Sequence, residues 1–189
     1  MSLEVWALFV ITESILCLTP GPAVLLVVAQ ALGRGAAASV WATLGILTGN
    51  ALYFALSATG LGAAYLIWLG VRAFVGRSAT RSTAPTVAAG RRRTFVNGFV
   101  LQAANPKALL FFVALLPQFV EPGGHVAGQV LVLAVTSVAI ELVILLAYGA
   151  AAGRLRALTA SPRVARLADG LAGTMLVTAG IGLAAVRRS

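Results

Sequence analysis

Long hydrophobic runs separated by short polar stretches dominate the pattern of this chain. The runs cover residues 5–32, 40–59, 62–75, 95–120, 126–152 and 167–186. A helix needs about 20 apolar residues to cross the hydrocarbon core of a bilayer, within a range of about 17–25. The pattern therefore predicts an all-α integral membrane protein with six transmembrane helices, of which the third is the shortest.

Proline interrupts the first and the fourth of these runs. The first run contains "TPGP" at residues 19–22, and the fourth contains "NPK" at residues 105–107. Proline removes a backbone N–H and clashes with the carbonyl four residues earlier, so one helix should end and another begin at each place. Freed backbone groups are tolerated at membrane depth only where they are buried in protein or line a wet cavity.

A polar, arginine-rich linker divides the runs into two sets of three. Residues 1–78 form the first set, residues 79–93 the linker and residues 94–189 the second set. Three spans per half make the halves run in opposite directions, which predicts two inverted three-helix repeats, each opening with a proline-broken span. Paired interrupted helices indicate a transporter's substrate site. A simple kink is the alternative at either proline site taken alone.

The composition excludes a soluble protein. Of 189 residues, 60% are hydrophobic and 10% are charged, and the mean hydropathy is +0.97. Soluble domains average about 45–50% apolar residues and about 25% charged residues. The single cysteine, Cys17, excludes an intrachain disulfide and a cysteine-based metal cluster. The N-terminus has neither a basic region nor a cleavage site and is predicted to remain as the first span. We expect no metal and no cofactor.

The basic residues indicate topology and not nucleic-acid binding. The net charge is +9, and 13 of the 14 basic residues are arginines that lie between the apolar runs. Such placement is not a continuous basic face, which disfavours a nucleic-acid partner. Arginines concentrate after the first, third and fifth spans, so the positive-inside rule predicts these loops to be cytoplasmic and both termini to be external.

Four ionisable residues interrupt the predicted spans: Glu13, Lys107, Glu141 and Asp169. Each costs roughly 2.5–3.5 kcal/mol on insertion scales, which favours a functional role. Lys107 starts a new helical stretch, where a cation opposes the helix dipole. A bound anion or a facing carboxylate would offset this cost, and an ion pair with Glu141 is the structural alternative.

The acidic residues of this set are candidates for proton coupling. Glu141 lies in the middle of the fifth span, and Glu13 lies two helical turns before Pro20 on the same helix face. Asp169 is equally well explained as a helix cap. Asn50 is uncharged, and we interpret it as a residue that joins two helices, with nearby glycines allowing close packing.

These motifs resemble the lysine exporter (LysE/RhtB) superfamily, and in particular its homoserine/threonine exporter-like members. The resemblance rests on "TPGP", "GAAYLIWLG", "NPKALLFFVALLPQFV", "IELVILLAYG" and "ADGLAGTMLVTAGIGL" and covers nearly the whole chain. It implies a multi-pass protein of the bacterial inner membrane that exports small amino acids or derivatives, of the homoserine, threonine, homoserine lactone or lysine type, by proton antiport. The family's motif positions fall on Pro20, Gly21, Pro22, Asn105, Pro106, Lys107, Glu141 and Asp169. Many members carry Asp or Asn after "PGP", where this chain has Ala23.

The predicted site joins both broken spans. We expect helix N-termini to hold the substrate carboxylate and Glu141 or Glu13 to meet the ammonium, with Glu141, Glu13 and Asp169 coupling protons. The predicted substrate-binding residues are Pro20, Gly21, Pro22, Ala23, Asn105, Pro106 and Lys107. The partners are an amino-acid substrate, protons and the lipid bilayer, and association into a homo-oligomer stays open.

Two functions other than export are possible interpretations of the sequence. A non-transporting, structural membrane protein is the alternative, motivated by the shortened connection between the second and third spans. An intramembrane enzyme is disfavoured because the sequence lacks a nucleophile–base constellation.

Overall fold

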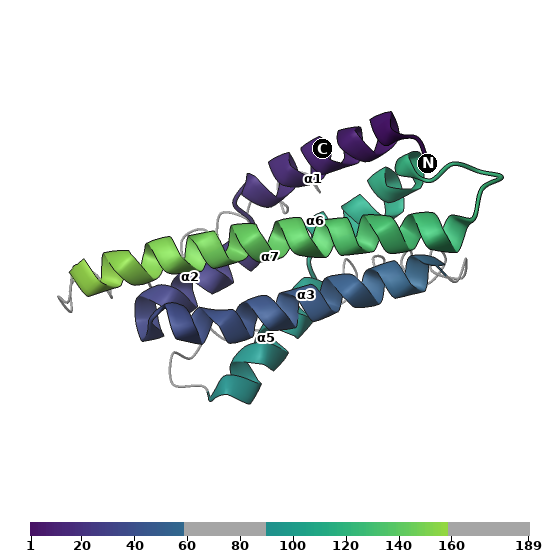
Figure 1. Ribbon diagram of the computed structural model, residues 1–189. Helices are drawn as coiled ribbons and strands as arrows, with labels where there is room; N and C mark the ends of the chain where they lie inside the picture. The colour runs from purple at the N-terminus through teal and green to yellow at the C-terminus, as the bar shows by residue number, and fades with distance from the viewer. Residues whose placement is uncertain (59–89, 159–189) are drawn as a thin grey trace, which may run out of the picture.

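The computed structural model describes residues 1–58 and 90–158, and all regular structure within these ranges is helical (Figure 1). The predicted third and sixth spans, most of the linker and Asp169 lie outside the described residues. The helices are α1 (Leu3–Leu18), α2 (Pro22–Arg34), α3 (Ala36–Ala58), α5 (Arg91–Ala103), α6 (Pro106–Leu110) and α7 (Val126–Leu158). A π-helical turn, η1 (Phe111–Leu115), and a 3₁₀ turn, η2 (Leu116–Phe119), follow α6.

Between two and four membrane spans fit the described residues. Helices α3 and α7 are each long and apolar enough to cross a bilayer. The pair α1–α2 and the segment from α5 to η2 reach that length only as bent units, with angles of 51° and 45° at their breaks. The proline-rich stretches therefore break both helices where the sequence predicts, although α3, α5 and α7 extend beyond the expected apolar cores.

The first break follows from local backbone chemistry. Helix α1 ends when both the N–H and the hydroxyl of Thr19 turn back to the carbonyl of Ile15. Gly21 then adopts an extended conformation, and Pro22 occupies the first turn of α2, where its missing N–H has no intrahelical role.

The second break is closed by a side chain. Asn105 is extended and its side-chain oxygen accepts a hydrogen bond from the N–H of Lys107, at 3.1 Å. Pro106 takes the first helical position of α6. An Asn cap followed by proline is a strong signal for a helix start.

Glycines let α3 and α5 pack with their backbones in close contact. A Cβ atom on Gly45 would lie 2.0 Å from the carbonyl oxygen of Phe95, and one on Gly98 would lie 2.3 Å from that of Ala42. No larger residue fits at such spacing, which confirms the packing role expected for Gly45 and shows the same role for Gly98, which was not predicted. Helix α7 runs along the bundle and packs against α1, α2 and α3 (Figure 1).

Two apolar clusters flank the breaks. An aromatic cluster joins α1, α3 and the segment after α6, with ring centroids 5.3 Å apart for Phe9 and Phe119 and 4.7 Å apart for Phe54 and Phe112. An aliphatic cluster joins α2, α3 and α7. Edge-to-face aromatic pairs add to the burial energy of the first cluster.

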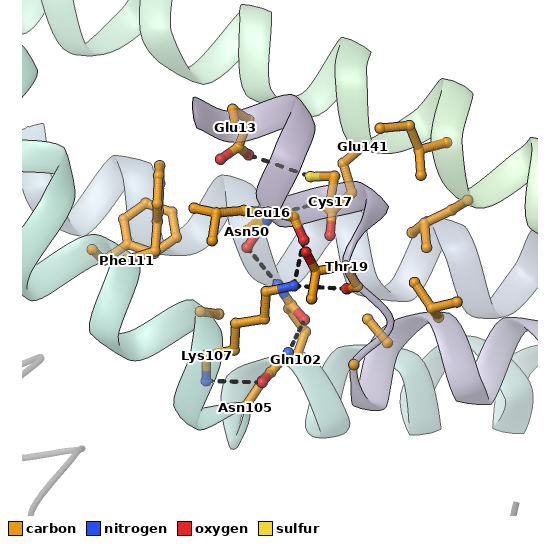
Figure 2. A pocket seen from close by; sticks show the side chains of 17 residues that line it. Glu13, Leu16, Cys17, Thr19, Asn50, Gln102, Asn105, Lys107, Phe111 and Glu141 are labelled. Carbon is orange, nitrogen blue, oxygen red and sulfur yellow. Dashed lines mark hydrogen bonds between the residues drawn. The ribbon is translucent and has the colours of Figure 1, made fainter. Parts of the chain in front are cut away.

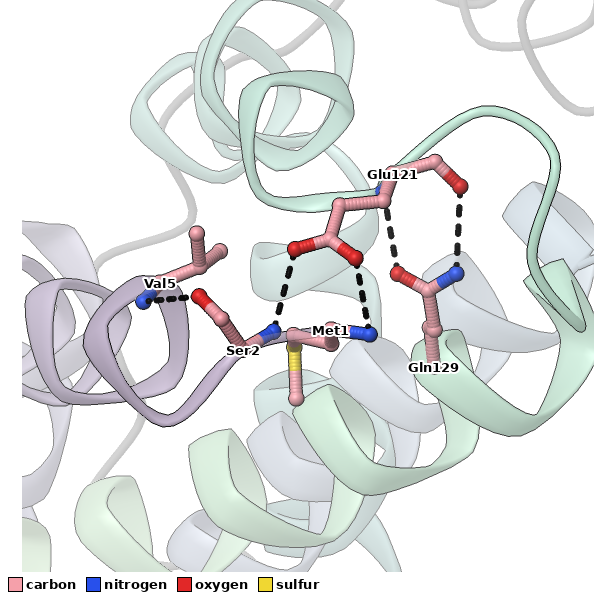
Figure 3. A network of polar contacts seen from close by, with 5 residues as sticks. All are labelled: Met1, Ser2, Val5, Glu121 and Gln129. Carbon is pink, nitrogen blue, oxygen red and sulfur yellow. Dashed lines mark hydrogen bonds and ion pairs between the residues drawn. The ribbon is translucent and has the colours of Figure 1, made fainter.

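A polar network at the start of the chain ties α1 to the loop that precedes α7 (Figure 3). The N-terminal ammonium lies 2.9 Å from one carboxylate oxygen of Glu121, and the N–H of Ser2 donates to the other at 3.0 Å. Gln129 exchanges two hydrogen bonds with the Glu121 backbone. The ammonium and the Ser2 N–H hold the pKa of the Glu121 carboxyl below its usual range.

Candidate functional site

A polar cavity lies where the two helix breaks approach each other (Figure 2). Its volume is about 70 Å³, several times the ~10–15 Å³ that one water molecule requires. Its polar wall comes from five helices and both breaks, through Glu13, Thr19, Asn50, Gln102, Asn105, Lys107 and Glu141.

Most of the predicted site residues line this cavity. Gly21, Ala23, Asn105 and Lys107 contribute from the two breaks, and Glu13 and Glu141 from α1 and α7. The three prolines, Pro20, Pro22 and Pro106, are not among the lining residues and act through the backbone they shape. Asp169 lies outside the described residues.

Lys107 projects from the start of α6 to the end of α1. Its ammonium donates to the carbonyl oxygens of Leu16 and, at 2.9 Å, of Thr19 (Figure 2). The last carbonyls of a helix lack intrahelical donors and form the negative end of its dipole. The end of α1 therefore offsets the unfavourable position of Lys107 on α6, and the described residues contain no Lys107–Glu141 ion pair.

A tyrosine completes the end of α1. The Tyr148 hydroxyl on α7 donates to the carbonyl of Leu18 at 2.9 Å. Tyr148 was not among the residues predicted from the sequence. The sequence feature that pointed to Tyr148 was its hydroxyl within an apolar span, because a tyrosine hydroxyl in such surroundings needs a hydrogen-bond partner.

The start of α2 is open toward the cavity. Gly21 provides no side-chain cap, and both Ala23 and Val24 of the first turn line the cavity. A Cβ atom on Gly21 would lie 3.9 Å from the Lys107 ammonium nitrogen. First-turn N–H groups and a neighbouring cation together make a site suited to an anion.

Two buried carboxyl groups occupy the other side of the cavity. Glu13 is 4% exposed and accepts hydrogen bonds from the Ser137 hydroxyl and, at 3.7 Å, from the Cys17 thiol. Glu141 is 7% exposed and accepts from the amide nitrogen of Asn50. Carboxyl groups from two helices in one cavity can hold a proton or an ammonium group.

Buried amides connect Glu141 to the second break. Gln102 donates to the Asn50 oxygen at 2.6 Å, and Asn105 donates to the Gln102 oxygen at 3.1 Å. Asn50 does join two helices, as expected, but it also lines the cavity. Gln102 was not among the residues predicted from the sequence, although a glutamine three residues before a capping asparagine was an available signal.

Comparisons with known proteins give matches over nearly the whole chain. A family model described as LysE type translocator matches residues 14–63 and 59–187. The chain is 28% identical over 204 residues to an uncharacterized membrane protein of Vibrio cholerae, covering 99% of this chain and 100% of that protein. It is 27% identical over 206 residues to the homoserine/homoserine lactone efflux protein of Salmonella typhimurium, covering 100% of both.

A further relative covers part of the chain. The leucine efflux protein of Salmonella choleraesuis is 28% identical over 158 residues, which cover 71% of this chain and 72% of that protein. No solved structure gives a significant match.

Proposed function

Because this chain belongs to the LysE type translocator family of membrane transporters, we propose that it exports small amino acids or their derivatives across the bacterial inner membrane by proton antiport. It is a multi-pass membrane protein and not an enzyme. The names of its relatives make homoserine, homoserine lactone and leucine the first substrates to test.

In the proposed architecture, six spans form two inverted three-helix repeats, residues 1–78 and 94–189, joined by the linker 79–93. The two bent helix pairs support this arrangement, because each falls at the start of one proposed repeat. Inverted repeats with a broken first helix place a substrate site between the halves.

The proposed orientation places the arginine-rich end in the cytoplasm and the termini outside. Arg34, at the end of α2, donates to Thr94 of α5 at 3.0 Å, and Arg91 lies over the ring of Trp41 in α3. A Cβ atom on Gly35 would lie 3.2 Å from a guanidinium nitrogen of Arg156. Basic residues from three helices thus meet at one end, which the positive-inside rule assigns to the cytoplasm.

In the proposed binding mode, the substrate carboxylate lies between the Lys107 ammonium and the first turn of α2. The substrate ammonium lies between Glu13 and Glu141. The remaining motif residues, Pro20, Gly21, Pro22, Ala23, Asn105 and Pro106, shape the two breaks. The single observation that carries the proposal is that both breaks meet at one cavity with the side chains of Glu13, Lys107 and Glu141.

Charge counting gives a reason for proton coupling. With Glu13, Glu141 and Lys107 ionised, the cavity has a formal charge of −1, which one proton neutralises. A zwitterionic amino acid does not change this charge. A proton on Glu141 or Glu13 removes an acceptor for the substrate ammonium, so proton and substrate compete as antiport requires. Asp169 remains a third proposed coupling residue.

The test is efflux of labelled homoserine, threonine or leucine from proteoliposomes containing the whole chain. We expect Lys107→Ala and Glu141→Gln to abolish efflux at unchanged protein content. Glu121→Gln is the matched control, because Glu121 is a carboxylate 47% exposed and outside the cavity. Normal efflux by both cavity variants would rule out the proposed roles.

One observation favours a structural role instead. Lys107 already donates to two carbonyls of α1 and could serve to hold the break together. If the wild-type protein moves none of these solutes and Lys107→Ala lowers its thermal stability in detergent, the chain is a non-transporting member of the family.

A further inference from the structure

A continuous line of hydrogen bonds runs from the second helix break to Glu141. It starts at the backbone N–H of Lys107, which donates to the side-chain oxygen of Asn105 at 3.1 Å. Asn105 donates to Gln102 at 3.1 Å, and Gln102 donates to Asn50 at 2.6 Å. Asn50 donates to the Oε2 oxygen of Glu141. Three amides from α3, α5 and the break thus link α6 to α7.

The backbone fixes the direction of this line. A backbone N–H can only donate, so Asn105 must present its oxygen to Lys107 and its NH₂ group to Gln102. The same reasoning orients Gln102 and then Asn50. Asn50, the last amide, must therefore present its NH₂ group to Glu141. If any one amide were reversed, a donor would face a donor or an acceptor would face an acceptor.

Burial and packing keep the amides in place. Asn50, Gln102 and Asn105 are 6%, 3% and 5% exposed. A Cβ atom on Gly49 would lie 3.0 Å from the Gln102 Cβ, so the glycine face of α3 is what brings Gln102 within reach of Asn50. A buried amide without its partner is costly, which favours retention of the whole line.

We propose that Asn50, Gln102 and Asn105 are positioning residues for proton coupling: they hold an N–H donor against Oε2 of Glu141 and leave Oε1 as the oxygen that takes the proton. The carbonyl oxygen of a protonated carboxyl group is a better acceptor than its hydroxyl oxygen, so a donor held at Oε2 favours protonation at Oε1. This inference rests on the proposed function in one respect, namely that the proton on Glu141 is the one exchanged for substrate.

The other ionisable groups that line the cavity around Glu141 come from two elements of the described chain. Helix α1 contributes Glu13 and Cys17, and α6 contributes Lys107. Helix α3 and helix α5 contribute the amides. The proposal must therefore be tested with Glu13, Cys17 and Lys107 left intact, so that only the amide line changes.

Two measurements on the full chain in lipid separate this inference from the proposed function. Infrared titration of the protonated carboxyl band, with Glu141→Gln as the subtraction reference, reports proton binding by Glu141 without any substrate. The pH profile of efflux from proteoliposomes reports its use in transport. If the wild type does not transport, the infrared titration still decides whether the amides position Glu141.

We expect Asn50→Leu to move the midpoint of the Glu141 carboxyl band to higher pH by about one unit, since a donor to an ionised group is lost. Gln102→Met and Asn105→Ser should move it in the same direction by less, because they loosen Asn50 without removing it. Serine retains the cap of α6. Where the protein transports, the pH profile of efflux should move with the band.

Thr43→Val is the matched control on α3. The Thr43 hydroxyl is buried and has no hydrogen-bond partner among the described residues, so its loss should leave the midpoint unchanged. The proposal is overturned if the amide variants lose stability or rate while the midpoint stays at the wild-type value. If Asn50→Leu does not fold, the same criterion applies to Gln102→Met and Asn105→Ser.

Discussion

The two helix breaks are alike at the end of the helix that precedes them and differ at the start of the helix that follows. At the end of each upstream helix, a tyrosine from another helix caps a carbonyl: Tyr148 donates to Leu18 at 2.9 Å, and Tyr53 donates to Ala103 at 2.7 Å. The downstream starts differ, because Asn105 caps α6 with its side chain whereas Gly21 leaves α2 without a side-chain cap.

This difference assigns distinct tasks to the two breaks. The second break satisfies its own first turn and sends Lys107 across to the first break. The first break leaves the start of α2 without a side-chain cap, and its residues Gly21 and Ala23 line the cavity beside that ammonium. The second break therefore satisfies its own first turn, whereas the uncapped start of α2 at the first break is where the proposed function places the substrate carboxylate.

The largest effect should follow removal of the ammonium that joins the breaks. Lys107→Met leaves the Leu16 and Thr19 carbonyls without their donor, and we expect a loss of about 2–4 kcal/mol in the free energy of unfolding, because bonds from charged groups contribute roughly 1.5–3 kcal/mol each. Denaturant unfolding in detergent measures it. A stability equal to wild type would show that the first break does not depend on the second.

Loss of the local cap should have a smaller effect. Asn105→Ala removes both the acceptor for the Lys107 N–H and the donor to Gln102 and should cost about 1–2 kcal/mol, whereas Asn105→Ser should cost less because serine keeps the helix cap. The same unfolding experiment compares the pair. Equal losses in both variants would show that the cap is not what stabilises the second break.

The two tyrosines allow a matched comparison of the helix ends. Tyr53 is 2% exposed, while Tyr148 is only partly buried. Tyr53→Phe should therefore cost about 1–1.5 kcal/mol and Tyr148→Phe about 0.5 kcal/mol, since a buried acceptor that loses its donor has no water to replace it. A larger loss for Tyr148→Phe than for Tyr53→Phe would mean that the end of α1 depends more on its tyrosine than the end of α5 does.

The smallest effect concerns the outer ends of the two broken segments, which meet through Glu121. The pKa of its carboxyl is lowered in the folded state by the N-terminal ammonium. This contribution to stability is present above the unfolded pKa, about 4.3, and is lost as pH falls through the lower folded value.

Glu121→Gln should accordingly be slightly less stable than wild type at neutral pH, and the difference should vanish in acid. Melting temperatures measured against pH test this, with Glu4→Gln as the control for loss of a carboxylate from the same end of the molecule. A difference that persists at the most acidic pH would contradict the ion pair as its cause.

Much of the fold could be predicted from local sequence. Proline at 20, 22 and 106 fixed both breaks, because ring geometry and a missing N–H act on the chain wherever they occur. Gly45 was predicted to be a packing residue from the glycines near Asn50, whereas the same role of Gly98 was not predicted. The sequence also predicted three residues that line the candidate site, Glu13, Lys107 and Glu141, because an ionisable side chain at membrane depth is costly without a function.

The partners of those residues depended on tertiary structure. Lys107 could be predicted to need an acceptor, but not that the acceptor would be the end of α1 in place of a carboxylate. Gln102 and Tyr148 gave weaker signals, because a single polar residue in an apolar helix faces the cavity or a neighbour according to how that helix is rotated.

The sequence by itself thus determined that this protein lies in a membrane, where two of its helices break and that Glu13 and Glu141 lie within its apolar spans. Only the tertiary structure decided that the breaks adjoin one cavity and which donor meets which acceptor. The physical reason is that backbone constraints and the cost of burying charge are properties of each residue in its segment. Hydrogen-bond partners are set instead by helix packing, here through glycine contacts between residues far apart in the chain.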